Sequence, residues 1–182
     1  MNYRLVAATA LLLTATAAAV ADDGKLEFPA NYREWIFLSS SLDMSYSKLQ
    51  SMMGHSMFDN IFVDPVSYRE FLKSGTWPEK TQLVMEMRGA TGKGSINQQG
   101  KFQSGEPMGV EVHVKDSARF PGGWAFFAFG GGTEPAQALP PTAECYSCHQ
   151  QHGAVNTTFV QFYPTLLKVA TEKKTLSPNY HP

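Results

Sequence analysis

Two stretches of the chain alternate between apolar and polar residues with the period of two that is typical of a β-strand with one buried face. In the stretch from Thr81 to Arg88, the apolar face carries Leu83, Met85 and Met87. The stretch from Met108 to Lys115 alternates in the same way. We expect its valines to point inward and its polar residues to point outward, the latter being Glu111, His113 and Lys115.

Three further stretches are apolar without this alternation. Trp124 to Phe129 is apolar on both faces and predicts a central strand that is covered on each side. Phe58 to Val63 is a short apolar run, and Tyr32 to Leu38 predicts a strand or a short buried helix. Ser39 to His55 is polar and rich in Ser and Met, and it predicts an irregular surface loop.

Helical signals mark three further segments. Asp64 is a candidate N-cap with Pro65 at the first helical position, so residues 65 to 73 predict a short amphipathic helix. Thr142 is a candidate N-cap for a second helix, and Phe159 to Ala170 predicts a last one with Pro164 near its start. This order predicts an α+β domain dominated by an antiparallel sheet with short helices.

The N-terminus has the pattern of a secretory signal peptide. Arg4 supplies a positive charge, a run of apolar and small residues follows, and Ala19-Val20-Ala21 fits the cleavage rule. We therefore expect residues 1–21 to be removed on export to the periplasm, leaving residues 22–182 as one domain without a membrane span. The net charge of −1 favours neither nucleic acid nor an anionic membrane as a partner.

Both cysteines of the chain lie in Cys145-Tyr-Ser-Cys148-His149, and this spacing is the attachment motif of a c-type haem. Residues three and four apart share one face of a helix, so the two thiols can reach two vinyl groups on one edge of a porphyrin. His149 can then bind the iron as proximal ligand. The motif predicts one covalently attached haem c per chain.

Other uses of these cysteines fit the sequence less well. A disulfide across two residues would close too short a loop to stabilise much, and a thioredoxin-like site needs a strand-helix-strand context. A zinc site would also have to include His152. On a helix, Cys145 to His152 spans roughly 10 Å of rise, too far for one tetrahedral ion to collect all four ligands.

Several motifs together resemble the cytochrome P-460 family, which includes the cytochromes c′-beta. The resemblance covers roughly residues 31 to 166 and combines Gly123-Trp-Ala-Phe126 with the haem motif and Phe162-Tyr-Pro-Thr-Leu166. The other matching segments are Asn31-Tyr-Arg-Glu-Trp35, Asp64-Pro65 with Tyr68 and Gly75, Gly109-Val-Glu111, Val114-Lys-Asp116, Arg119-Phe120 and Pro141-Thr-Ala-Glu-Cys145.

The resemblance implies a five-coordinate haem held against an antiparallel sheet, usually in a homodimer. In the hydroxylamine-oxidising members, a lysine on the strand equivalent to Thr81–Arg88 is bonded to the porphyrin edge, and this chain has Met85 there. A thioether cannot form that cross-link as an amine does. Two roles are therefore open for Met85. Its side chain either only packs in the hydrophobic core or binds the iron as a sixth ligand.

The remaining candidates for the haem surroundings are few. The histidines outside the motif are expected to be exposed, with His152 near the proximal side and a haem propionate as its candidate partner; the others are His55, His113 and His181. The many phenylalanines near the strands suit an apolar wall over the distal haem face, with Phe62 as the candidate distal cap. Glu144 is expected to serve the helix N-terminus.

Three functions are compatible with these residues. The first is a c′-beta-like cytochrome whose vacant iron position binds small gases such as nitric oxide in an apolar pocket. The second is a hydroxylamine-oxidising enzyme, which needs a distal acid or base and which Met85 disfavours. The third is electron transfer, which requires a six-coordinate iron. The redox partner and the physiological ligand are not specified by the sequence.

Overall fold

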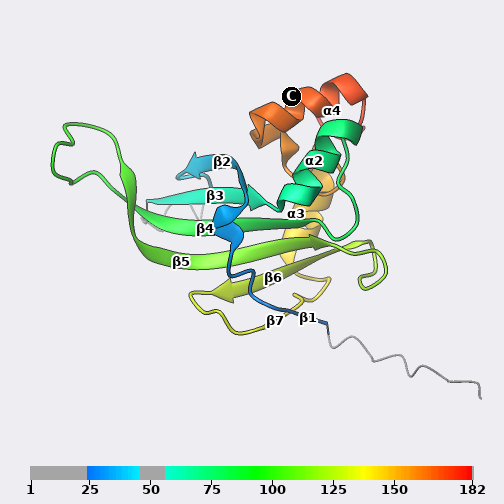
Figure 1. Ribbon diagram of the computed structural model, residues 1–182, viewed down its shortest axis with the longest axis horizontal. Helices are drawn as coiled ribbons and strands as arrows, with labels where there is room; N and C mark the ends of the chain where they lie inside the picture. Colours follow the sequence, from blue (N-terminus) through cyan, green and yellow to red (C-terminus); the bar gives the residue numbers. More distant parts are fainter. Residues whose placement is uncertain (1–23, 46–55, 182) are drawn as a thin grey trace, which may run out of the picture.

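The computed structural model describes residues 24–45 and 56–181, so the predicted signal peptide, most of the Ser- and Met-rich segment and His55 lie outside the described residues. The main element is a five-stranded antiparallel sheet in the order β2-β3-β4-β5-β6 (Figure 1). Its strands are β2 Ile36–Leu42, β3 Met57–Val63, β4 Gln82–Thr91, β5 Phe102–Lys115 and β6 Trp124–Gly130.

Short elements complete the domain. Strands β1 Lys25–Leu26 and β7 Ala136–Gln137 form a small second sheet, and the helices are η1 Tyr32–Glu34, α2 Pro65–Ser74, α3 Glu144–His152, η2 Val160–Phe162 and α4 Pro164–Lys173. Helices α2 and α4 lie together at one end of the main sheet, and the β4–β5 hairpin projects from the other end (Figure 1). The predicted α+β architecture with an antiparallel sheet is confirmed. In the described part of the chain, no helix has the length and apolar character needed to cross a membrane.

Helix α2 forms where its capping residues predict it. The Asp64 side chain accepts a hydrogen bond from the Ser67 backbone N–H at 2.8 Å, and Pro65 occupies the first turn. Gly75 ends the helix with φ of 76°, a left-handed conformation that glycine adopts without strain. The carboxylate of Asp64 also accepts from the Gln82 N–H at 3.1 Å, which ties α2 to the start of β4.

The main sheet is covered on both faces. On one face, α2 and α4 pack a cluster that includes Phe71, Trp77 and Leu166, each almost fully buried. On the opposite face, the cluster consists mainly of alternate strand residues with η1 and the small second sheet, and it includes Val84, Val112 and Phe127. Because both faces carry a buried cluster, a polar residue in these strands can also be buried.

Several sequence-based expectations are corrected. Strand β6 is an edge strand of the main sheet, although its residues 124–127 are buried, because the 136–139 segment and α3 cover it. The polar segment after Leu38 continues β2 as far as Leu42. Thr142 is not the N-cap of the haem-motif helix: α3 begins at Glu144 after Ala143, and no side chain caps it.

Candidate functional site

The haem motif lies on α3, which is fixed against the edge of the sheet by its own tyrosine. The Tyr146 hydroxyl accepts a hydrogen bond from the Phe126 N–H at 3.3 Å and donates to the Leu139 carbonyl at 3.0 Å. Cys145 and Cys148 are half-buried free thiols. Burial raises the pKa of the Cys145 thiol, and the nearby Glu111 carboxylate acts in the same direction. Both sulfurs line a cavity of about 830 Å³ between α3 and the sheet.

Among residues 24–45 and 56–181, one ring nitrogen of His149 has a hydrogen-bond partner and the other has none. Its Nδ1 lies 2.7 Å from the Thr157 backbone oxygen, which can only accept, so Nδ1 carries the proton. Burial lowers the pKa of His149 and so favours the neutral imidazole. The lone pair is therefore on Nε2, the tautomer that a metal-binding histidine adopts when a carbonyl orients it from behind.

The segment after α3 brings Thr157 to His149 by close backbone packing. The Gly153 N–H donates to the His149 carbonyl at 2.9 Å. A Cβ on Gly153 would lie 2.7 Å from that carbonyl oxygen and 2.8 Å from the Thr158 nitrogen, so a side chain does not fit. Trp77 fixes the segment from the core side, since its indole Nε1 donates to Thr158 Oγ1 at 2.8 Å.

His113 is buried beside His149, contrary to the expectation that it is exposed. It is 6% exposed, and its ring stacks on Phe126 with 3.9 Å between centroids. The His149 ring meets it edge-on at 5.0 Å. Burial lowers the pKa of His113 well below its usual range. The strand alternation was correct in placing His113 opposite the valines, but that face points into the site.

The wall of the cavity that faces α3 is formed by the sheet. Leu83, Met85 and Met87 all line it, which confirms their predicted shared direction. Met85 is half-buried and pairs in register with Ile61 and Glu111. Whether Met85 contacts a haem or ligates its iron stays a prediction.

Two carboxylates also line this wall, so the expected apolar pocket needs correction. Asp59 and Glu111 project into the cavity from β3 and β5. Burial raises the pKa of both groups, and the charge of Asp59 raises that of Glu111 further. Ser41 donates to Asp59 Oδ2 at 3.2 Å. A raised pKa means that each of these carboxyls binds its proton more tightly than an ordinary surface carboxylate does.

Phe62 lies on the opposite face of the sheet from the cavity, which corrects its assignment as a distal cap. It pairs in register with Val84 and packs against Tyr32, with 5.6 Å between ring centroids. Of the predicted aromatic wall, Phe126 lines the cavity, while Phe127 and Phe129 belong to the cluster on the other face. Phe159 and Phe162, which follow α3 in the sequence, also line the cavity.

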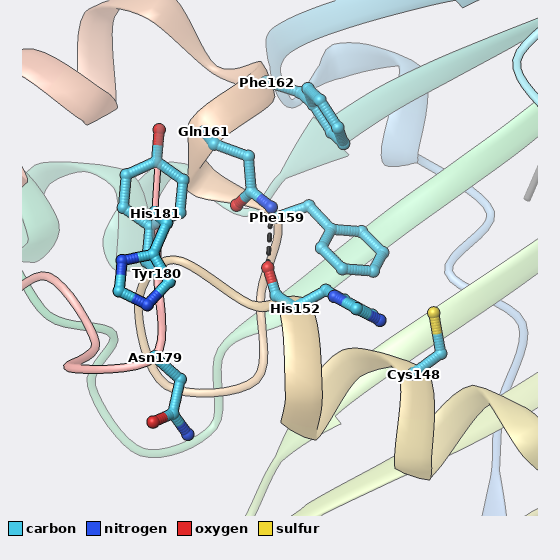
Figure 2. Close-up of a pocket in the computed structure, with 8 residues that line it drawn as sticks. All are labelled: Cys148, His152, Phe159, Gln161, Phe162, Asn179, Tyr180 and His181. Carbon is cyan, nitrogen blue, oxygen red and sulfur yellow. Dashed lines mark hydrogen bonds between the residues drawn. The ribbon is translucent and has the colours of Figure 1, made fainter.

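A second cavity of about 670 Å³ lies beside α3 toward the C-terminal segment (Figure 2). Figure 2 shows Cys148, Phe159 and His152 on one side and His181 with Tyr180 on the other. Gln161 Nε2 donates to the His152 carbonyl at 2.7 Å. His152 and His181 are exposed, as expected, and their rings do not converge.

Sequence reasoning found the motif but missed residues that surround it, namely Asp59, Glu111, His113, Thr157 and Phe159. A usable signal existed for Glu111 and His113, because both lie on one side of a strand whose valines lie on the other. The helix that carries the haem motif packs against one face of the sheet. If that face is the polar one, Glu111 and His113 face the haem site. For Asp59 and Thr157 no local pattern distinguishes them from loop or surface residues.

The comparisons with known proteins give one family. Residues 29–160 match the family model described as Cytochrome P460, while no curated protein matches the chain significantly. The cavity fits the cofactor that this family implies. It offers two thiols and an imidazole Nε2 on one side and lies within the roughly 300–1,000 Å³ typical of ligand and cofactor sites. The chain therefore belongs to the cytochrome P460 family and is a haem-binding cytochrome.

Proposed function

We propose that this protein is an exported mono-haem c-type cytochrome whose iron keeps one position free for a small neutral ligand such as nitric oxide. The observation that carries the proposal is the hydrogen bond from His149 Nδ1 to the Thr157 carbonyl at 2.7 Å. It orients one imidazole as an iron ligand, in the same helix as the two thiols. The haem supplies an iron centre that binds diatomic gases and exchanges single electrons.

The proximal side is assigned to α3 in this proposal. Cys145 and Cys148 would hold the porphyrin through thioether bonds, and His149 Nε2 would bind the iron. His113 is a poor candidate for the opposite ligand, because its ring lies against His149 and its Nε2 is 3.5 Å from Thr157 Oγ1, behind the proximal imidazole. Export and a homodimer are part of the proposal and rest on the signal-like N-terminus and the family resemblance.

Optical spectra of the oxidised and reduced protein, with and without nitric oxide, test the iron coordination. We expect high-spin spectra at rest and binding of nitric oxide by the reduced protein. The variant His149→Ala is expected to lose the proximal ligand, whereas the matched control His152→Ala, on the same helix, keeps the native spectrum. A low-spin six-coordinate resting state, or a reduced protein that does not bind nitric oxide, would refute the proposal.

The covalent attachment has its own test. The intact mass of protein matured with haem is expected to equal the chain plus one haem. Replacing both Cys145 and Cys148 with alanine is expected to leave haem that acid and organic solvent extract. A wild-type haem that is extracted as readily contradicts the c-type assignment.

A second function, oxidation of a small nitrogenous substrate such as hydroxylamine, is favoured by Asp59 and Glu111. Such an oxidation releases protons as well as electrons, and a carboxylate in the cavity wall can accept the protons. Met85, in place of the cross-linking lysine, still argues against it. The test is turnover of hydroxylamine with a dye as electron acceptor. Turnover clearly above that of free haem, and lost in Glu111→Gln, would place this function first.

A further inference from the structure

His113 is held rigidly on the haem side of the sheet. It pairs in register with Leu83 of β4 and Phe126 of β6. Its ring is parallel to that of Phe126 to within 11° and lies 4.4 Å from the ring of Trp124. With a side chain only 6% exposed and aromatic rings packed on it, the imidazole has little freedom to move.

From this position His113 contacts two parts of the proximal site at once. Its ring meets the His149 ring edge-on at 5.0 Å, with 79° between the planes. Its Nε2 lies 3.5 Å from Thr157 Oγ1, and the backbone carbonyl of the same Thr157 binds His149 Nδ1. One side chain therefore touches both the ligand and the residue that orients it.

The residue type is informative because burial of a polar ring has a cost. An apolar aromatic side chain would fill the same space between Trp124 and Phe126 without removing two polar nitrogens from water. An imidazole at this position is explained if one of its nitrogens makes a polar contact. Among the described residues, the Thr157 hydroxyl lies beside its Nε2. Partners of this kind, one step removed from the metal, set the orientation and the basicity of a metal-binding histidine.

We propose that His113 is a positioning residue for the proximal ligand. Through the Thr157 hydroxyl and the edge-on ring contact, it holds the carbonyl and the His149 ring in the arrangement that makes Nε2 a strong donor to iron. This inference rests on the proposed role of His149 as iron ligand. It assigns to His113 no contact with the iron or with a substrate.

The iron–histidine stretching band of the reduced protein, measured by resonance Raman spectroscopy, reports the strength of this bond directly. We expect His113→Phe, which keeps an aromatic ring, and Thr157→Val, which keeps the backbone carbonyl, each to shift the band to lower frequency and to raise the reduction potential. Because both remove the same contact, the double variant is expected to shift the band no further than either single variant. The control His181→Phe alters an exposed histidine and is expected to leave the band unchanged.

The outcomes separate this inference from the proposed function. If the wild-type protein shows no iron–histidine band, the ligand assignment fails, and with it this inference. If the wild-type band is present but is unchanged in His113→Phe, the positioning role alone is refuted. Should His113→Phe not fold, Thr157→Val tests the same contact, and an unchanged band in that variant refutes the inference equally.

Discussion

Glu86 lies next to Met85 on β4 but points to the opposite face of the sheet, where it is 3% exposed. Its carboxylate accepts hydrogen bonds from Arg88 Nε at 2.6 Å, from Arg33 Nε at 2.9 Å and from the Tyr32 hydroxyl. Replacing it with glutamine removes the charge but keeps the shape. We expect Glu86→Gln to destabilise the fold and to remove a defined part of its acid sensitivity.

The magnitude follows from the lowered pKa. The hydrogen bonds from Arg88, Tyr32 and Arg33 outweigh the opposing effect of burial and lower the pKa of Glu86 from 4.5 to about 2. At 1.36 kcal/mol per pKa unit, this difference corresponds to about 3 kcal/mol. Because the Arg33 side chain is 51% exposed, solvent screens part of its contribution. We therefore expect Glu86→Gln to lower the free energy of unfolding by at least about 2 kcal/mol.

The lowered pKa also fixes the pH range. A carboxylate whose pKa falls on folding stabilises the protein above its unfolded value of about 4.5, and this contribution is lost as the pH falls toward 2. Urea unfolding of the haem-loaded protein, followed by far-ultraviolet circular dichroism between pH 7 and pH 3, measures it. The wild-type free energy of unfolding should approach that of Glu86→Gln as the pH decreases.

A matched control is Glu70→Gln. Glu70 pairs with Lys73 on the surface of α2 and is half exposed, so its replacement is expected to change the free energy of unfolding by less than about 0.5 kcal/mol. If Glu86→Gln is as stable as the wild type at pH 7 and shows the same pH dependence, the reasoning about this buried charge network is wrong.

Three further predictions concern the haem side. Gly153→Ala forces a Cβ against the His149 carbonyl and the Thr158 nitrogen, and we expect a loss of about 1–3 kcal/mol on urea unfolding together with an altered haem spectrum; an unchanged spectrum would contradict the close packing. Glu111→Gln should raise the melting temperature at pH 7, because the raised pKa of the Glu111 carboxyl means that its contribution to stability is lost as the pH rises through that pKa. Each kcal/mol of added stability corresponds to about 2–4 °C. The gain should vanish near pH 4, and equal melting temperatures at pH 7 would contradict the raised pKa of Glu111. Met85→Leu should leave the coordination state unchanged if Met85 is core filler, and a change from low-spin to high-spin iron in this variant would identify it as a ligand instead.

The sequence and the structure agree where the signal is local. The Asp64-Pro65 cap predicted α2, and the alternation in residues 81–88 correctly put Met85 on one face with Leu83 and Met87, all of which line the cavity. Local signals were weaker at the ends of elements. The predicted cap at Thr142 is replaced by a start after Ala143 that no side chain caps, while the Tyr146 hydroxyl ties α3 to β6.

The errors at His113 and Phe62 have one physical cause. A period of two tells which residues of a strand share a face, and it assigns the polar face to water only if the sheet has a solvent side. Here α2, α3 and α4 cover one face, and η1 with the small sheet covers the other. His113 was therefore placed outside although it is buried, and Phe62 was placed at the haem although it packs on the far side.

By itself, the sequence determined the antiparallel α+β architecture, the haem motif from Cys145 to His149 and the absence of a lysine at position 85. These depend on residue type and short spacing, which the linear chain contains. Only the tertiary structure decided that Glu111 and His113 face the cavity and that Thr157 orients His149. The register between strands and the cover of each face arise from contacts between residues far apart in the chain, and no local pattern encodes them.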